Sequence, residues 1–393
     1  MARLTKVALG LSGGGFGGYL FEIGALTALD DAFDPSFTTN DFDRYIGVSA
    51  GSPAAALLAN GVRPEEILKA NLYGHRPFYF ERRDISAPAM GEGFKTFVRT
   101  AQHFMPLLKM FYQNWQDMSF IDLVNKAQNA LPNGVYSLDP FARYLEATFA
   151  AKGLSNSFER LGKELYIPAI DLETGKTVMF GDKKFSGVPI SKAICASSAA
   201  PVYFCPIKIN DRDYIDGGVA GIPLFELPVW NEVEFMVIIN PTVLLGPDPT
   251  GQELWKPKIN GHSLRKRGFH SIGDQAKRIN YNARFSQAFQ LFREEHPDKE
   301  FFIIAPHPSM SRLLEGSFLS FRDRVHLLQA GYESVVRILE ERLAENHELF
   351  ARNRIPVSLP RLKARVRKRL EEFGAQGRPC IPSVRNKALT VPG

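Results

Sequence analysis

The feature that most constrains the fold is a cluster of six glycines within residues 10–18, in the stretch GLSGGGFGG. Glycine loses more conformational freedom on folding than any other residue, so this density indicates backbone that must adopt unusual angles or approach another group closely. Apolar alternation predicts a buried strand before the glycines, at Val7–Leu11, and helical spacing predicts a helix after them, at Tyr19–Phe33. A loop in this setting can direct several backbone N–H groups to one point, beside the positive end of the helix dipole.

The next elements repeat this alternation of strand and helix. A short strand is predicted at Tyr45–Val48 and a helix at Pro53–Asn60, where proline in the first turn suits a helix start. The rest of the chain predicts a hairpin, three more core strands and one long helix, at residues 165–180, 213–215, 235–239, 301–304 and 322–349. Strands that alternate with helices form a mostly parallel sheet covered on both faces, so we predict an α/β fold with three α/β/α layers.

Charge is distributed unevenly along the chain. The net charge is +6, but residues 352–393 alone carry eleven Lys and Arg against two Asp and Glu. The rest of the chain is close to neutral, which argues against the basic face of a nucleic-acid-binding domain. The three cysteines, Cys195, Cys205 and Cys380, have no CxxC spacing, so we predict neither a disulfide framework nor a zinc site. No signal peptide and no membrane-spanning segment is predicted.

Two kinds of ligand suit the glycine loop: a phosphate, or the oxyanion of an acyl-transfer intermediate. A nucleotide P-loop would end in Gly-Lys-Ser or Gly-Lys-Thr, whereas this loop ends in Gly17-Gly18-Tyr19. The GxGxxG pattern of dinucleotide binding is met by Gly13, Gly15 and Gly18, but the acidic residue required at the end of the second strand is missing from the sequence. A dinucleotide-binding oxidoreductase is therefore the weaker alternative.

The second strand leads into GVSAG at residues 47–51, a GxSxG sequence on a strand-to-helix turn. Such a turn strains the backbone and lifts the serine hydroxyl clear of the sheet, while Gly47 and Gly51 leave room for a close approach. Ser49 is therefore the candidate nucleophile. Ser52 lacks flanking glycines, and we interpret it as a helix-start residue.

A serine nucleophile needs a base. None of the eight histidines lies in a motif typical of a catalytic base; His307 is the best placed of them, and we interpret it as structural or facing solvent. The better candidate is Asp216, which ends a short strand and precedes Gly217 and Gly218, so that its oxygens stay accessible. Ser49 and Asp216, at the ends of two strands of one sheet, could meet directly. Because an aspartate is a weak base at its ordinary pKa of about 3.9, we expect apolar surroundings to raise that pKa.

Taken in order, GGGFGG at 13–18, GVSAG at 47–51 and DGG at 216–218 resemble the patatin-like phospholipase family, a group of lipid acyl hydrolases with a Ser-Asp dyad. Two longer stretches are also similar to the family, AIDLETGKTVMFGD at 169–182 and CASSAAPVYFCPIKI at 195–209. The resemblance covers about residues 6–240, and it is specific because all five motifs follow in the family's order.

The resemblance implies that Ser49 is the nucleophile and Asp216 the base, and that the oxyanion hole is formed by backbone amides of Gly13, Gly14 and Gly15. It implies a serine hydrolase of the phospholipase A, lysophospholipase or esterase type, acting on lipid or phospholipid esters without a metal or other cofactor. A catalytically inert lipid-binding or effector protein on the same fold is the alternative. One departure is Gly17, where the family often has Arg or Lys, so a preference for anionic phospholipids is not predicted.

Residues 1–350 are predicted to form the hydrolase domain. Within it, we expect the aromatic segment at about 73–120 to be a helical cap or lid, and residues 245–273 to be a mobile surface loop. Residues 351–393 form a basic tail, in which RLKARVRKRLEEF at 361–373 predicts an amphipathic helix. Such a helix can lie on an anionic membrane surface or pack by its apolar stripe against the domain. We therefore expect a cytoplasmic protein, with a peripheral membrane contact and leaderless export left open.

Overall fold

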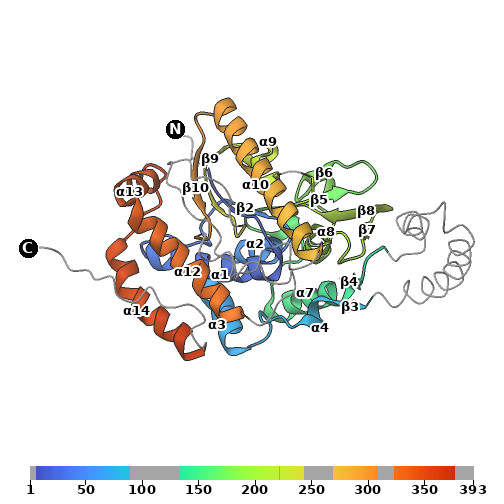
Figure 1. The fold of residues 1–393 in the computed structure, drawn as a ribbon, viewed down its shortest axis with the longest axis horizontal. Coiled ribbons are helices and arrows are strands. Elements are labelled where there is room, and N and C mark those ends of the chain that lie inside the picture. The colour runs from blue at the N-terminus through green and yellow to red at the C-terminus, as the bar shows by residue number, and fades with distance from the viewer. Residues whose placement is uncertain (1–5, 89–132, 221, 243–268, 308–322, 377–393) are drawn as a thin grey trace, which may run out of the picture.

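The computed structural model describes residues 6–88, 133–220, 222–242, 269–307 and 323–376 (Figure 1). An eight-stranded sheet lies at the centre, in the order β10-β9-β1-β2-β5-β8-β7, with β6 also paired to β5. Its strands are β1 (Lys6–Leu11), β2 (Arg44–Gly47), β5 (Glu164–Asp171), β6 (Thr177–Phe180), β7 (Ile207–Ile209), β8 (Arg212–Asp216), β9 (Val233–Ile239) and β10 (Glu300–Ile304). A separate short pair joins β3 (Ala87–Pro88) to β4 (Tyr136–Ser137).

Helices connect these strands along most of the chain. They are α1 (Gly15–Ala32), α2 (Gly51–Ala59), α3 (Pro64–Tyr73), α4 (Arg82–Ile85), α7 (Asp139–Lys152), α8 (Ile190–Ser197), α9 (Leu227–Trp230), α10 (Phe269–Glu295), α12 (Arg324–Glu341), α13 (Leu343–Arg352) and α14 (Leu359–Gln376). The strands and helices predicted for the first sixty residues are confirmed with shifted ends. The largest shift is at α1, which begins inside the glycine loop at Gly15 rather than at Tyr19.

The sheet changes direction at β5, and this change positions the candidate catalytic residues. β10, β9, β1, β2 and β5 are each parallel to their neighbours in this part of the sheet. β2 pairs only with the first residues of β5, from Glu164 to Tyr166, whereas β8 runs antiparallel along Ala169–Asp171. The carboxyl ends of β2 and β8 therefore approach each other from opposite directions, beside the middle of β5.

Helices cover both faces of the sheet. On β9, Phe235, Val237 and Ile239 belong to the core that includes α1, α2 and α12, whereas Met236 and Ile238 belong to the core under α9 and α10. Successive residues of a strand point to opposite faces, so a strand buried on both sides is apolar throughout. The predicted three-layer α/β/α fold with a mostly parallel sheet is confirmed.

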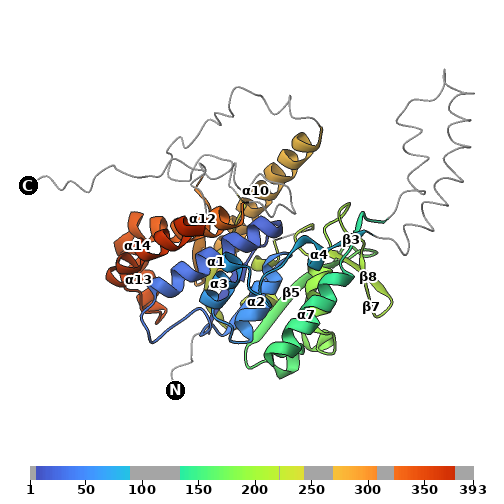
Figure 2. The ribbon, with the colours of Figure 1, turned by 90° about the horizontal axis from the view of Figure 1, so that it is seen from below.

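Helices α1 and α12 lie side by side on one face, with their backbones in contact (Figure 2). A Cβ atom at Gly24 would lie 1.9 Å from the carbonyl oxygen of Leu328, and one at Gly331 would lie 1.9 Å from that of Phe21. Only glycine allows helices to approach so closely. This packing holds the start of α1, which carries the glycine loop, against the body of the domain.

The single helix predicted over Arg322–Leu349 is wrong, because the chain bends between α12 and α13 at Arg342, where φ is −127° and ψ is 51°. The bend has a packing reason. It turns α13 so that Phe350, which is fully buried, contacts the rings of Phe33, Phe235 and Phe302. The apolar periodicity of residues 322–349 predicts one straight helix, whereas the bend at Arg342 brings Phe350 to the sheet.

The basic segment after residue 350 also packs against the domain, so the predicted boundary at 350 does not mark the end of the folded body. Leu362 and Phe373 of α14 are fully buried, against α1 and α12. Arg369 is also buried, and its Nε donates to the Asp31 carboxylate of α1 at 2.8 Å. Of the two packings predicted for this helix, the structure has the apolar stripe against the domain.

We expect Arg369→Ala to lower the free energy of unfolding by about 2–3 kcal/mol, because it leaves the buried Asp31 carboxylate with one cation, Arg365, instead of two. Urea denaturation followed by circular dichroism measures the change. Arg367→Ala is the matched control on the same helix, since its side chain is 90% exposed and pairs only with Glu371; there the expected change is below about 0.5 kcal/mol. Equal effects of the two substitutions would contradict a structural role for α14.

Two predicted segments lie largely outside the described residues. Of the cap predicted at about 73–120, the structure describes the part up to residue 88, where Phe78 and Phe80 are buried in the core. The loop predicted at 245–273 is described only from Phe269, which begins α10. Within the described residues, no helix is both long enough and apolar enough to cross a membrane.

Candidate active site

Ser49 lies on a sharp turn between β2 and α2. Its backbone has φ of +51°, in the left-handed region that residues with a side chain rarely adopt. This conformation is the strained strand-to-helix turn that the GVSAG sequence predicts, and it leaves Ser49 6% exposed, at the wall of a pocket. Ser52 lies in the first turn of α2 and donates its hydroxyl proton to the Ser49 carbonyl at 2.6 Å. The interpretation of Ser52 as a helix-start residue is therefore confirmed.

Asp216 ends β8 and meets Ser49 directly. The Ser49 hydroxyl donates to Asp216 Oδ2 at 2.5 Å, and the Gly218 amide donates to Asp216 Oδ1 at 2.8 Å. Burial raises the pKa of Asp216 to about 6, although both hydrogen bonds act to lower it. The predicted meeting of these two residues and the predicted rise in pKa are both found in the structure. A carboxylate with this pKa is ionised near neutral pH and still basic enough to accept a proton from the serine.

Residues at the end of α8 form hydrogen bonds that hold the backbone of Ser49 and of Asp216 in place. The Ser49 amide donates to Ser197 Oγ at 2.9 Å, and Ser198 Oγ donates to the Ser49 carbonyl at 3.2 Å. The amides of Asp216 and Gly217 donate to the carbonyls of Ala199 and Ser197. In the sequence, the CASSAAP segment shows only a resemblance to the family, and no pattern within it predicts a site residue. The signal that could have identified them is the serine pair itself, placed at the end of a helix beside the predicted strand.

The glycine loop lies directly over the Ser49 turn. Gly13, Gly14 and Gly15 have φ values of +80°, +102° and +70°, three successive left-handed residues. A Cβ atom at Gly13 would lie 2.4 Å from the Val48 carbonyl oxygen and 3.1 Å from Ser49 Cβ, so a side chain there would push the loop off the turn. The loop and the nucleophile are therefore in contact, as an oxyanion hole requires.

The predicted oxyanion hole needs one correction. The Gly13 amide donates to the carboxyl group of Glu22 at 2.8 Å, so this N–H group does not point to the reacting carbonyl. Gly14 precedes the first residue of α1 and Gly15 begins the helix, where N–H groups have no partner within the helix. The candidate donors are thus the amides of Gly14 and Gly15, beside the positive end of the α1 dipole.

The remaining motif glycines allow close packing around the site. At four of them, a Cβ atom would lie 2.1 to 2.7 Å from a backbone atom of another residue: Gly13 for Gly18, Ser52 for Gly47, Leu11 for Gly51, and Pro168 for Gly217. The fifth, Gly218, donates its amide proton to Asp216. A Cβ atom at Gly17 would lie 3.7 Å from the Leu327 methyl groups of α12, an ordinary van der Waals contact.

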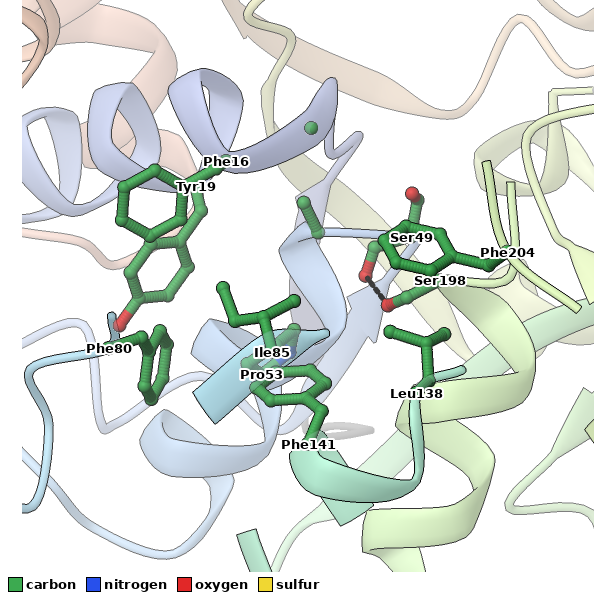
Figure 3. Close-up of a pocket in the computed structure, with 12 residues that line it drawn as sticks. Phe16, Tyr19, Ser49, Pro53, Phe80, Ile85, Leu138, Phe141, Ser198 and Phe204 are labelled. Atoms are coloured by element: carbon green, nitrogen blue, oxygen red, sulfur yellow. Dashed lines mark hydrogen bonds between the residues drawn. The ribbon is translucent and has the colours of Figure 1, made fainter. Parts of the chain in front are cut away.

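An apolar pocket opens beside Ser49 (Figure 3). Its cavity volume is about 50 Å³, and it is lined by Gly15, Phe16, Tyr19, Ser49, Ala50, Pro53, Phe80, Ile85, Leu138, Phe141, Ser198 and Phe204. The figure shows Ser49 and Ser198 beside Phe204 and Leu138, with Phe16, Tyr19 and Phe80 on the opposite side. A pocket with a nucleophile at one end and hydrocarbon walls suits an ester with an apolar chain.

Among the described residues, neither a histidine nor a metal site accompanies the pair. The pocket-lining residues in this part of the chain include no histidine, and no group of three or more His, Cys, Asp or Glu there could hold a metal ion. His307, the best placed histidine in the sequence, is half-buried, and burial lowers its pKa. The thiols of Cys195 and Cys205 lie within hydrogen-bonding distance of the carbonyls of Leu138 and Gly134, respectively.

A model of the patatin-like phospholipase family matches residues 9–227, which is more than half of the chain. The chain belongs to the patatin-like phospholipase family. The matched region runs from β1 past Asp216, so it contains the glycine loop, the Ser49 turn, the α8 end and the DGG sequence. The family that the five motifs predict is confirmed.

Individual relatives are more distant. The "Probable lipid hydrolase 463L" of Invertebrate iridescent virus 6 is 27% identical over 215 residues, which are 53% of this patatin-like chain and 58% of the viral protein. Among solved structures, VipD from Legionella pneumophila is 14% identical, with a TM-score of 0.37 over 86% of this chain and 67% of VipD. The type III effector ExoU, known from Pseudomonas aeruginosa, is 15% identical, with a TM-score of 0.37 over 86% of this chain and 53% of ExoU.

Proposed function

We propose that this protein is a serine lipid acyl hydrolase that cleaves carboxylic ester bonds, of the phospholipase A, lysophospholipase or esterase type. The observation that carries the proposal is the 2.5 Å hydrogen bond from Ser49 Oγ to the buried Asp216 carboxylate, at the wall of an apolar pocket. Membership of the patatin-like phospholipase family supports it.

The reaction has two steps. Asp216 Oδ2 takes the proton of the Ser49 hydroxyl as Oγ bonds to the ester carbonyl carbon, and the carbonyl electrons move to its oxygen. The intermediate then expels the alcohol, which takes the proton from Asp216, and leaves an acyl group on Ser49. In the second step Asp216 takes a proton from water while the water oxygen attacks the acyl carbon, and Ser49 recovers its proton as the fatty acid leaves.

The surroundings of the pair supply the rest of the catalysis. The amides of Gly14 and Gly15 stabilise the negative oxygen of each intermediate, an effect of about 3–4 kcal/mol per donor in comparable sites. The apolar wall formed by Phe16, Phe80 and Phe141 holds the acyl chain. No step needs a metal ion, because the oxyanion is stabilised by backbone donors.

The alternatives make different predictions. An inert lipid-binding or effector protein on this fold would bind lipid without turnover that depends on Ser49. A dinucleotide-binding oxidoreductase would need an acidic residue after β2, where the chain instead has Val48 and Ser49. The second alternative also leaves the Ser49–Asp216 hydrogen bond without a purpose.

A substrate panel tests the proposal. The full chain is incubated without calcium with p-nitrophenyl butyrate and with vesicles of defined phosphatidylcholine and phosphatidylglycerol content, and released fatty acid and lysolipid are measured by mass spectrometry. We expect ester cleavage in both formats, and the lysolipid isomer identifies the bond cut. Absence of cleavage on every ester by a folded protein would contradict the proposal and favour the inert alternative.

Vesicles of the same lipids can test whether the protein binds a membrane surface. We propose a cytoplasmic protein that contacts membranes peripherally, through the cations of α14 that point away from the domain, Lys363, Arg367 and Lys368. Two other cations of this helix, Arg365 and Arg369, pair with the buried Asp31 carboxylate, so they contribute less to an outward basic surface. Co-sedimentation with phosphatidylglycerol vesicles should fall when Lys363 and Lys368 are replaced by Glu, and unchanged binding would contradict this role of α14.

A further inference from the structure

The catalytic scheme leaves one buried carboxyl group without a role, that of Glu22. It lies in the second turn of α1, is fully buried, and interrupts an otherwise apolar run of residues from Tyr19 to Leu26. Its Oε1 atom accepts the Gly13 amide proton at 2.8 Å, and its Oε2 atom has no hydrogen-bond partner among the described residues. Burying a carboxyl group is costly, so an unpaired one in an apolar helix calls for a specific reason.

The geometry of the glycine loop supplies that reason. Three successive glycines in the left-handed region have little conformational preference of their own, so the loop must be held by contacts from outside. One anchor lies before it, where the Ser12 amide donates to the Ile239 carbonyl at 3.0 Å. The Glu22 carboxyl is the next anchor, and it holds the residue that packs on Ser49 Cβ.

We propose that Glu22 is the positioning residue of the oxyanion site: its carboxyl group anchors Gly13, and through Gly13 it fixes where the amides of Gly14 and Gly15 lie relative to Ser49. The inference rests on the proposed hydrolase function. Glu22 touches neither the pocket nor Ser49, so its effect on catalysis is exerted through the loop.

Glu22 performs this role best without a charge. Burial raises the pKa of Glu22 well above its ordinary range, so the surroundings of the carboxyl group favour its neutral form. A negative charge behind the loop would oppose the negative oxygen that the loop stabilises, whereas a neutral carbonyl oxygen accepts the Gly13 proton without this conflict. A glutamine side chain has the same length and the same neutral acceptor.

Two substitutions separate positioning from packing. Glu22→Gln keeps the acceptor, whereas Glu22→Met fills a similar volume without one. We expect Glu22→Gln to keep kcat within about threefold of the wild type. We expect Glu22→Met to lower kcat about 10- to 100-fold with KM changed less than about threefold, since misplacing a donor loses part of the 10²- to 10³-fold effect of removing one. A purely structural role predicts instead that activity follows the melting temperature in both variants.

The variants are assayed in the full chain with p-nitrophenyl butyrate, beside the wild type and Ser49→Ala. Full kcat in Glu22→Met would overturn the proposal, and so would an equal loss in Glu22→Gln when both variants melt like the wild type. Hydrogen–deuterium exchange of peptides covering residues 11–18 gives a readout independent of turnover. Faster exchange in Glu22→Met than in Glu22→Gln supports the anchor even if the wild type shows no Ser49-dependent turnover, in which case the hydrolase proposal alone fails. Equal exchange in all three proteins overturns the anchor.

Discussion

Replacing Ser49 by Ala is expected to lower kcat by about 10⁴-fold or more on every ester that the wild type cleaves, because it removes the hydroxyl group that the proposed mechanism uses to attack the carbonyl. The variant should remain folded, since the Ser49 amide and carbonyl keep their bonds to Ser197, Ser198 and Ser52. Stopped assays with purified protein measure the rate, and circular dichroism verifies the fold. A fluorophosphonate probe should add one covalent adduct to the wild type and none to the variant.

The matched controls are two other serines. Ser186 donates its hydroxyl proton within a turn and does not line the pocket, so Ser186→Ala should keep wild-type kinetics. Ser198 lines the pocket and donates to the Ser49 carbonyl, so Ser198→Ala should lower kcat by less than about tenfold, the value of one neutral hydrogen bond. If Ser198→Ala matched Ser49→Ala in its loss, or if probe labelling persisted without Ser49, the assignment of the nucleophile would be wrong.

The sequence predicts the pair of catalytic candidates because their signals are local. A buried strand is recognised from a few apolar residues, and GVSAG and DGG each follow such a strand. Their separation of 167 residues did not prevent the prediction, since carboxyl ends of strands gather at common places in an α/β sheet. What the sequence does not contain is the way they meet, with β8 running antiparallel into the space beyond the end of β2.

Contacts that depend on the tertiary fold leave no signal in the local sequence. No pattern near Glu22 in the sequence indicates that its carboxyl group accepts a hydrogen bond from the Gly13 amide. An acidic residue in a helix ordinarily faces solvent. The basic composition of the α14 segment predicts a tail, but Arg369 binds Asp31, which lies 338 residues earlier in the chain. In both cases the contact is made through the tertiary fold, so local composition does not identify the partner.

The second large effect is expected from Asp216→Asn, which keeps the shape of the side chain and removes the proton acceptor. An amide nitrogen can donate to Ser49 Oγ and an amide oxygen can accept from the Gly218 amide, so both hydrogen-bonded contacts survive. We expect kcat/KM to fall about 10²- to 10⁴-fold, the range typical of general-base catalysis. Near-wild-type activity in this variant would remove Asp216 from the mechanism.

The pH dependence gives an independent test of the same residue. The Asp216 carboxylate must be ionised to accept the serine proton, and its pKa is about 6. Wild-type kcat/KM on p-nitrophenyl butyrate should therefore be level above about pH 7 and fall about tenfold per pH unit below pH 6. The residual activity of Asp216→Asn should lack this acidic limb, while Ser198→Ala should retain it.

Asp216→Asn should also make the protein more stable at neutral pH. The pKa of Asp216 is about 6 in the folded state and about 3.9 in the unfolded chain, so the folded state binds a proton more tightly. The stability that Asp216 contributes is therefore present below about pH 4 and is lost as pH rises through 6, when the buried group must ionise. Asparagine avoids this ionisation, and we expect a gain of up to about 3 kcal/mol at pH 8 that disappears near pH 4. Urea denaturation of both proteins at the two pH values measures it. A gain at pH 8 together with the loss of activity would mean that the site holds its base ionised at the expense of folding stability, whereas equal stabilities would mean that Asp216 is not held in a desolvated state.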